Sequence, residues 1–427
     1  MLTDWMHWVT SLHPDELWYV LGFLLFVDTP RYVGCTLVMT AYDSLIGMWN
    51  WLSGNSGPVR YQVCPSVCVL LVGHNEGSTI GATLASIWGT YPRMEIIVVD
   101  DGSTDDMTHI AREFASTHAG VLVFRRDDRG GKSSALNWGL RYTRAEIVVC
   151  VDTDSRISPT GLWDIVQPFA DSRVGAVSAA VLTWNAFTNL VTWLQAYEYR
   201  QTIFMGRMVQ ERLGCLGIVS GAFGAFRRTA LEQVGAWDVG PGEDGDVTLR
   251  LRKAGYEIAV APYAECHTNV PTAWGRLFKQ RCRWDRTVIT FECRKHIDMS
   301  QPWTRHFRLT NALLLLERWF FNIVCVFTFW AYALWLLIAF DGNMVNTLIL
   351  LYLLQLALEF CQALLLLCYS RTPGRDLLLA AVLPFVPLYQ VFIKLADLVA
   401  ILEEIFVRKS ATDNFVPEKV RSVTWHW

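Results

Sequence analysis

Charged residues are scarce in this chain of 427 residues, because Asp, Glu, Lys and Arg together make up only 18% of the sequence. Soluble proteins carry about 25% charged residues, so a wholly soluble protein is not expected. The chain also lacks an excess of one charge sign, since its formal net charge is −3. This excludes binding to nucleic acid through a global basic field, and we expect no nucleic-acid partner.

The sequence also lacks the spacings of several common sites and signals. Among the eleven cysteines, Cys64 and Cys68 form a C-x3-C pair with no second pair or histidine at zinc-binding spacing. Buried free thiols are the favoured interpretation of most cysteines, and they indicate a reducing compartment. Residues 1–15 lack the basic n-region of a cleavable signal peptide, so none is predicted.

Apolar residues, by contrast, are abundant: they make up 52% of the chain and are concentrated at its two ends. Residues 312–340 and 344–369 form apolar runs, and each is longer than the roughly 20 residues that span a bilayer. A third run, residues 376–406, is broken by Pro384 and Pro387. It predicts either a kinked span or a helix lying partly in the interface, so a lipid bilayer is an expected partner.

The N-terminal apolar stretch, residues 16–51, is interrupted by Asp28, Pro30 and Arg31. We favour one span followed by an interfacial helix, with a tight hairpin as the alternative. Lys and Arg are absent from residues 1–15 but crowd residues 305–308 and 371–375. By the positive-inside rule, this asymmetry places the N-terminus outside and the segment after it in the cytoplasm.

Between the apolar ends, short β-rich runs alternate with helical stretches. The predicted strands are residues 67–72, 95–99, 121–124 and 146–151, and the predicted helices are residues 79–89, 105–118, 132–142 and 160–170. Continuous apolar strands separated by helices predict an α/β domain with a parallel sheet. Ligands of such sheets bind at the carboxyl ends of the strands.

Acidic residues stand at two of these strand ends. The sequence D-D-G-S at 100–103 places carboxylates where they can accept hydrogen bonds from a base or ribose, although a turn that caps the next helix is the alternative. The sequence D-T-D at 152–154 supplies two carboxylates that can share a divalent cation, which also holds a diphosphate. A polar loop would explain either motif alone, but two acidic ends in one sheet favour a binding site.

Three further motifs point to polar chemistry. Lys132 lies beside two glycines at a helix start, where it can meet phosphate oxygens, with a solvated loop lysine as the alternative. The acids at 243–244 begin a helix, where they either cap it or supply a general base. The sequence Q-R-C-R-W at 280–284 lies in a basic stretch before the apolar runs, and such a stretch commonly faces anionic headgroups. Its arginine can also neutralise a diphosphate, and its tryptophan can stack on a sugar ring.

The motifs D-D-G-S, D-x-D, E-D and Q-x-x-R-W occur in this order and are followed by the C-terminal apolar runs. In this arrangement they resemble the motifs of the processive family 2 glycosyltransferases. This family includes cellulose, hyaluronan, chitin-oligosaccharide and bacterial poly-N-acetylglucosamine synthases. The resemblance is dense over about residues 66–290. It implies a type A glycosyltransferase (Rossmann-like) domain inserted between N-terminal and C-terminal membrane helices, with the helices forming a channel for the glycan.

The resemblance also implies roles for the donor-site residues. Asp101, together with Asp100, would contact the uridine of a UDP-sugar, and Lys132 would lie near the nucleotide. Asp152 and Asp154 would hold Mg²⁺ or Mn²⁺ on the diphosphate, with Asp154 as the more direct ligand.

On the acceptor side, the resemblance implies that Asp244, next to Glu243, deprotonates the acceptor hydroxyl of the growing glycan. The residues expected at the acceptor end and the leaving diphosphate are Ser220, Gly221, Gln280, Arg283 and Trp284. Aromatic residues of the spans would stack on sugars or, as is more common, face lipid or pack between helices.

The chain departs from cellulose synthases by lacking a cyclic-dinucleotide-binding domain and an F-x-V-T-x-K gating loop. Its tail, residues 414–427, either takes the place of that loop at the donor site or is a frayed terminus. The shorter layout is nearer to the synthases of hyaluronan, chitin oligosaccharides and poly-N-acetylglucosamine, which slightly favours UDP-N-acetylglucosamine as donor.

The expected protein is thus a processive, inverting β-glycosyltransferase that exports its product through its own spans. One alternative adds a single sugar to a lipid or short acceptor, and another is a catalytically silent partner of a synthase. The expected segments are residues 1–60 with membrane or interfacial helices, 61–300 with the catalytic domain, and 301–427 with interfacial and transmembrane helices and a tail. The expected location is the inner (plasma) membrane, multi-pass, with a cytoplasmic catalytic domain and with secretion or accessory subunits as possible partners.

Overall fold

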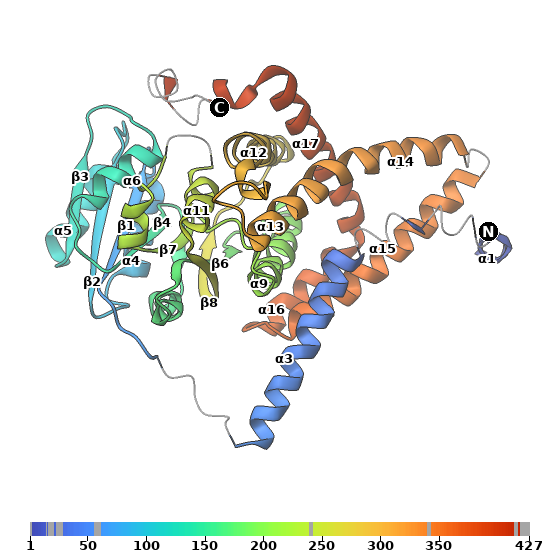
Figure 1. Ribbon diagram of the computed structural model, residues 1–427, viewed down its shortest axis with the longest axis horizontal. Helices are drawn as coiled ribbons and strands as arrows, with labels where there is room; N and C mark the ends of the chain where they lie inside the picture. The colour runs from blue at the N-terminus through green and yellow to red at the C-terminus, as the bar shows by residue number, and fades with distance from the viewer. Residues whose placement is uncertain are drawn as a thin grey trace.

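The computed structural model describes residues 2–13, 15, 21–22, 29–54, 61–238, 242–339, 343–413 and 417–418. Figure 1 shows a part built around a β-sheet, from which the long helices α14 (Cys325–Ala339) and α15 (Met344–Leu367) extend away. Helix α1 (Leu2–Ser11) lies beside their far end, where Trp5 Nε1 donates to the carbonyl of Asn346 at 3.2 Å.

A single eight-stranded sheet forms the centre of the first part, with strand order β3-β2-β1-β4-β7-β6-β8-β5. The strands are β1 (Val67–Gly73), β2 (Met94–Asp100), β3 (Val121–Arg125), β4 (Ile147–Asp152), β5 (Arg156–Ile157), β6 (Val174–Thr183), β7 (Phe223–Arg227) and β8 (Glu257–Thr268). Strand β1 is buried along its whole length, as expected for a sheet covered on both faces.

The pairing confirms the parallel prediction for the first four strands, because β2 and β4 both run parallel to β1, and β3 runs parallel to β2. The second half differs, since β7 runs antiparallel to both β4 and β6, while β6 and β8 are parallel. The sheet is therefore mixed. Apolar strand patterns specify burial on both faces but not strand direction, which depends on how the chain returns across the sheet.

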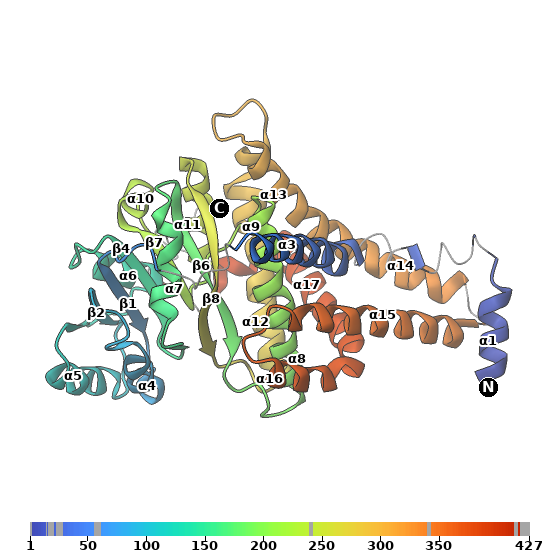
Figure 2. The same ribbon diagram turned by 90° about the horizontal axis from the view of Figure 1, so that it is seen from below.

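Helices cover both faces of the sheet. Ile80, Leu84 and Met107 are among the buried side chains that pack α4 and α5 on one face, together with α7, while Leu136, Val247 and Leu277 belong to the core on the other face. Figure 2 shows the long helices lying beyond this second group. The helices of this part are α4 (Gly77–Ile87), α5 (Met107–Thr117), α6 (Lys132–Leu140), α7 (Gly161–Val166), η3 (Gln167–Ala170), α8 (Leu190–Glu198), η4 (Tyr199–Met205), α9 (Gly206–Arg212), α10 (Arg228–Gln233), α11 (Glu243–Ala254), α12 (Trp274–Thr287), η5 (Val288–Lys295) and η6 (Ile297–Ser300).

Three helical runs in the described part of the chain are long and apolar enough to cross a membrane: Leu309–Ala339, Met344–Leu367 and Pro373–Val407. The first contains α13 (Leu309–Trp319), η7 (Phe320–Val324) and α14, and the third contains α16 (Pro373–Leu379), η9 (Ala380–Phe385) and α17 (Val386–Val407). Both uninterrupted apolar runs of the sequence prediction are thereby confirmed as helices. The 3-10 turn η9 contains Pro384, so the third run is helical with a local change of geometry at the proline. A last 3-10 turn, η10 (Lys409–Thr412), follows α17.

The N-terminal prediction falls partly outside the described residues, which omit 16–20 and 23–28. Within them, η2 (Pro30–Gly34) and α3 (Cys35–Leu52) form one helical run. Asp43 of α3 accepts a hydrogen bond from Tyr369 Oη at 2.7 Å, so this run lies against the end of α15. Whether it spans or lies in the interface stays a prediction.

Candidate active site

The carboxyl ends of the central strands bring the predicted motifs to one edge of the sheet. In the register of β1, Gly73 pairs with Asp100 of β2, and Val72 pairs with Asp152 of β4. Both acidic motifs therefore end level with each other, as parallel pairing requires. This edge carries the cluster that we call the donor edge: Lys132, Asp152, Asp154, Glu243 and Asp244.

Asp100 and Asp101 are buried, and local partners already occupy their oxygens. Asp100 accepts hydrogen bonds from Ser103 N at 2.8 Å and from the Thr108 hydroxyl. Asp101 accepts hydrogen bonds from the backbone N–H groups of Gly130 and Gly131 at 2.9 and 2.7 Å. In this structure Asp100 thus holds the turn at residues 100–103 in place, and Asp101 holds the loop that contains Gly130 and Gly131, which we call the glycine loop. A direct contact of either acid with a nucleotide stays a prediction.

Lys132 starts α6 directly after Gly131, which has φ +84° and leads the chain into the helix in a conformation that favours glycine. Its Nζ donates to Asp152 Oδ1 at 2.5 Å and lies 3.4 Å from Glu243 Oε1. Burial alone would lower the pKa of Lys132, but the carboxylates of Asp152 and Glu243 outweigh it and hold that pKa above its usual value. The lysine therefore stays cationic between the two acidic motifs.

The loop before β7 connects the lysine to the predicted base. Gly221 N donates to Asp244 Oδ2 at 3.4 Å. A Cβ atom on Gly221 would lie 3.0 Å from Lys132 Nζ and 3.7 Å from Asp244 Oδ2, so the absence of a side chain permits this close approach. The structure thus brings together residues from α6, the loop before β7 and α11 that are far apart in the sequence.

Helix α11 begins at Glu243, after Gly242 with φ +91°. Glu243 is 6% exposed and faces Lys132, whereas Asp244 is partly exposed. Burial, with the charge of Asp244 as a further contribution, raises the pKa of Glu243 above its usual range despite Lys132. Glu243 is therefore placed to hold the lysine, while Asp244 remains accessible for proton transfer.

Asp152 and Asp154 could hold a divalent cation. Burial and the neighbouring Asp152 carboxylate both raise the pKa of Asp154, so positive charge is in deficit at this point. No group of three or more His, Cys, Asp or Glu side chains converges on one point in the described part of the chain. Two carboxylates suit a cation that takes its other ligands from water and a diphosphate, as Mg²⁺ commonly does, so the donor set fits the predicted metal.

The predicted acceptor residues Gln280, Arg283 and Trp284 lie on α12. The C-terminal end of α12 lies close to the start of α11, because a Cβ atom on Gly242 would lie 2.7 Å from Thr287 Cγ2. Trp284 is 36% exposed, and the buried Gln280 Oε1 has no hydrogen-bond partner in the described part of the chain. The roles of these three side chains at the acceptor end and the leaving diphosphate stay predictions.

The intervening Arg281 was not predicted. It is 5% exposed, donates to Glu198 Oε2 at 2.8 Å, and its Cζ lies 4.5 Å from the centre of the Trp284 ring. The guanidinium of Arg281 therefore contacts the Trp284 ring and helps to hold its orientation. The sequence offered one signal, a second arginine within the Q-x-x-R-W segment, but an isolated basic residue beside a membrane block does not indicate burial.

The C-terminal tail lies mostly outside the described residues, which contain only 417–418 of residues 414–427. Pro417 lies against the glycine loop, since a Cβ atom on Gly131 would be 3.2 Å from Pro417 Cδ. Just before the tail, Asp413 Oδ2 lies 3.6 Å from Arg286 Nη1 of α12.

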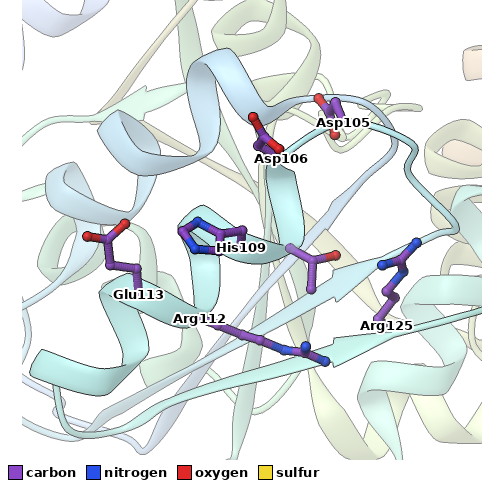
Figure 3. Close-up of a pocket in the computed structure, with 7 residues that line it drawn as sticks. Asp105, Asp106, His109, Arg112, Glu113 and Arg125 are labelled. Atoms are coloured by element: carbon purple, nitrogen blue, oxygen red, sulfur yellow. The ribbon is translucent and has the colours of Figure 1, made fainter.

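A separate pocket of about 460 Å³ opens beside α5 and the end of β3 (Figure 3). Asp105, His109, Arg112 and Arg125 are among the residues that line it, so both charge signs are present. It contains none of the predicted site residues.

Comparisons with known proteins agree with this architecture. The family described as "Glycosyltransferase like family 2" matches residues 65–287. The poly-β-1,6-N-acetyl-D-glucosamine synthase of Staphylococcus epidermidis is 34% identical over 228 residues, covering 53% of this chain and 55% of that protein. The enzyme of the same name from Staphylococcus aureus (strain COL) is 31% identical over 221 residues, covering 51% of this chain and 53% of that protein. The chain thus spans about half the length of the curated relatives it matches.

Among solved structures, a mannosyltransferase from Pyrobaculum calidifontis, in complex with GDP-Man and Mn²⁺, superimposes with a TM-score of 0.59. The match covers 91% of this chain and 98% of the other at 20% sequence identity, so it shows a shared fold. The family match by itself covers more than half of the 427 residues and contains every predicted site motif. The mixed α/β sheet, the level strand-end acids and this match together show that the chain belongs to glycosyltransferase family 2.

Proposed function

We propose that this protein is a membrane-embedded, processive and inverting glycosyltransferase that builds a β-linked polysaccharide from a UDP-sugar. The observation that carries the proposal is the meeting of Asp152, Lys132 and Asp244 around Gly221. A carboxylate for a donor-bound cation and a carboxylate for a base thereby both lie close to one lysine. Two-substrate transfer requires this adjacency of donor and acceptor groups.

The chemical step needs one base and a leaving group whose charge is neutralised. Asp244 takes the proton of the acceptor hydroxyl while the acceptor oxygen bonds to the anomeric carbon and the bond from that carbon to the diphosphate breaks. The electron pair of the broken bond leaves with UDP. Lys132, which stays cationic, offsets the charge that develops on the departing diphosphate.

Asp152 and Asp154 would hold Mg²⁺ or Mn²⁺, and that ion supplies further charge neutralisation on the diphosphate when bound. Asp100 and Asp101 would keep the strand-end turn and the glycine loop in the shape that receives the nucleoside. Ser220, Gln280, Arg283 and Trp284 would face the acceptor end of the growing glycan.

The names of the relatives support N-acetylglucosamine as the transferred sugar, because two poly-β-1,6-N-acetyl-D-glucosamine synthases match the catalytic region. The three apolar helices support a multi-pass membrane protein, with residues 61–300 as the catalytic domain between segments 1–60 and 301–427. We place this domain on the cytoplasmic side of the inner membrane, with the product passing through the chain's own spans. Accessory subunits would act on the secreted product.

The test is a transfer assay with the full chain in lipid nanodiscs. Each of several UDP-sugars is supplied with Mg²⁺ or Mn²⁺, and both UDP release and product length are recorded. UDP release from UDP-N-acetylglucosamine with long products is expected. Addition of one sugar only would contradict processivity, and no turnover with any donor would contradict the enzyme assignment.

A further inference from the structure

An arginine that no motif singled out borders the acceptor side of the site. Arg207 lies on α9, and its Nη1 donates to the hydroxyl of Ser178 in β6 at 3.0 Å. The same hydroxyl accepts a hydrogen bond from Ser220 N at 3.3 Å. Arg207 is therefore linked through one buried serine to the loop whose next residue, Gly221, donates to Asp244.

Two other arginines packed into this part of the molecule have carboxylate partners. Arg281 pairs with Glu198 at 2.8 Å and Arg200 pairs with Asp376 at 3.0 Å. Within the described residues, Arg207 makes no ion pair, and Ser178 is its hydrogen-bond partner. A guanidinium has five N–H donors in a planar fork, so most of its hydrogen-bonding capacity is unused here.

The unused donors are reachable. The Arg207 side chain is partly exposed, and none of its nitrogens is among the buried side-chain atoms of the described chain that lack a partner. Its unpaired N–H groups therefore face accessible space, in contrast to Arg281, whose Nε is buried without a partner.

The charges around Arg207 place this space beside the base. The ionisable groups that act on the guanidinium are Asp244, Tyr199 and Arg318. Burial lowers the pKa of Arg207 to about 10, so it is still cationic at neutral pH. Lys132 lies beside Asp152 and Glu243 and also feels the charge of Asp244. Both cations thus act on Asp244: Lys132 from beside the strand-end acids, and Arg207 from its place at Ser178.

We propose that Arg207 binds the terminal sugar of the acceptor through a carbonyl oxygen, the acetamido carbonyl of an N-acetylated residue, and so selects N-acetylated acceptors. This inference rests on the proposed function and adds a specificity residue to it. A partly desolvated guanidinium with no counter-ion gains most from a strong acceptor such as an amide carbonyl. The acceptor must lie beside Asp244, because its hydroxyl has to reach that carboxylate, and Ser178 and Ser220 link Arg207 to the loop that contacts Asp244.

The test compares a β-1,6-linked N-acetylglucosamine oligosaccharide with its de-N-acetylated form as acceptors, using UDP-N-acetylglucosamine and the full chain in nanodiscs. Wild-type protein is expected to favour the acetylated acceptor by about 10- to 100-fold in kcat/KM, the range of one charged hydrogen bond. Arg207→Gln is expected to reduce this ratio to about 1–3-fold, while the KM for the donor changes less than about 2-fold. Arg207→Lys should lie between them, because lysine keeps the charge but loses the fork.

Two further variants separate binding from folding. Ser178→Ala removes only the anchor of the guanidinium and should reduce the ratio by a smaller factor, about 2–5-fold. UDP binding, measured by calorimetry, reports whether each variant is folded. If Arg207→Gln fails to bind UDP, the acceptor preference of Arg207→Lys is used in its place. A preference for the acetylated acceptor that equals the wild-type value in Arg207→Lys overturns the proposal.

Other outcomes distinguish this inference from the proposed function. An active wild-type protein with no preference between the acceptors, or an Arg207→Gln variant that keeps the preference, overturns the role of Arg207 alone. A wild-type protein that releases no UDP from any sugar donor overturns the proposed function itself.

Discussion

The donor edge and the seam that η5 forms with α11 and α17 use charge in opposite ways. At the donor edge, four carboxylates surround Lys132, and burial together with repulsion raises the pKa of Asp154 and Glu243. At the seam, the buried acids Glu404 and Asp246 each have a cation beside them: Arg294 Nη1 lies 2.7 Å from Glu404, and Lys295 Nζ lies 2.8 Å from Asp246.

This difference teaches which acids stabilise the fold and which are kept for ligands. A buried acid with a matched cation contributes to stability as long as the pair is intact. Acids that crowd together without enough cations cost stability, and such an arrangement is typical of sites that bind or transform a charged ligand. This contrast can be tested by substitution, by metal removal and by pH, beginning with the largest expected effect.

Replacing Asp244 by Asn should have the largest effect on activity and little effect on folding. The amide cannot take the acceptor proton, so transfer is expected to fall by about 10³-fold or more. UDP binding and the thermal midpoint should stay near the wild-type values, because Asp244 makes no ion pair within the described residues. Transfer assays and calorimetry on the same preparation measure both quantities.

The matched control is Asp106→Asn, an exposed acid beside the pocket of Figure 3. It should retain full activity. An Asp244→Asn variant that still polymerises would show that another group is the base.

Removing divalent cations should reduce the transfer rate by about 10²-fold or more, because the diphosphate would then leave with Lys132 as its main counter-charge. Mn²⁺ or Mg²⁺ added back should restore activity. In Asp154→Asn the restoring concentration should rise at least about tenfold, since one of two carboxylate ligands is lost. Titration of activity against free metal measures this shift, and full activity in excess chelator would contradict a metal-dependent reaction.

Asp246 represents the paired seam, and its replacement by Asn should reduce stability more than activity. Its carboxylate is 1% exposed and lies 2.9 Å from Arg250 Nε and 2.8 Å from Lys295 Nζ. Loss of a buried charge partner costs about 3 kcal/mol, which lowers the Tm of a domain of this size by roughly 6–12 °C. Differential scanning calorimetry of the nanodisc-embedded protein measures the Tm.

The same residue predicts a pH dependence. Burial alone would raise the pKa of Asp246, but the hydrogen bond from His296 and the charges of Arg250 and Lys295 hold that pKa far below its usual range. Its stabilisation is therefore complete above about pH 4, the value of an unfolded aspartate, and is lost as the pH falls below it. The variant should lack this acid-side loss. Glu232→Gln, which breaks an exposed pair with Arg228, is the control and should shift Tm by less than about 2 °C.

Gly221→Ala should give the smallest effect. The added methyl group would lie 3.0 Å from Lys132 Nζ, and a flexible lysine can yield by a few tenths of an ångström. A fall of roughly 5–10-fold in kcat is expected, about 1 kcal/mol, with an unchanged Tm. Gly275→Ala on α12 meets no atom within 4 Å and should leave kcat unchanged. Equal rates for both variants would show that the close approach of Lys132 and Asp244 at Gly221 does not affect turnover.

Much of the first half of the fold could be predicted from the sequence. The strands ending at Asp100 and Asp152 are apolar runs with clear turn signals, and their pairing is parallel as predicted. The second half could not be predicted in the same way, because β7 is short and its antiparallel pairing with β4 depends on contacts between residues more than 70 positions apart. The roles of the motif acids were only partly visible, since a D-D-G-S motif does not reveal that Asp101 is bonded to Gly130 and Gly131.

By itself, the sequence determined the alternation of strands and helices, the apolar helices and the positions of the acidic motifs, since these depend on local patterns of hydrophobicity and turn residues. Only the tertiary structure decided which charges meet. Lys132, Asp152 and Asp244 come together, and Arg207 reaches Ser178 of β6, because the chain returns across the sheet through α9 and β7. Charge interactions act through space, so the partners of a buried acid depend on the fold and not on its neighbours in the chain.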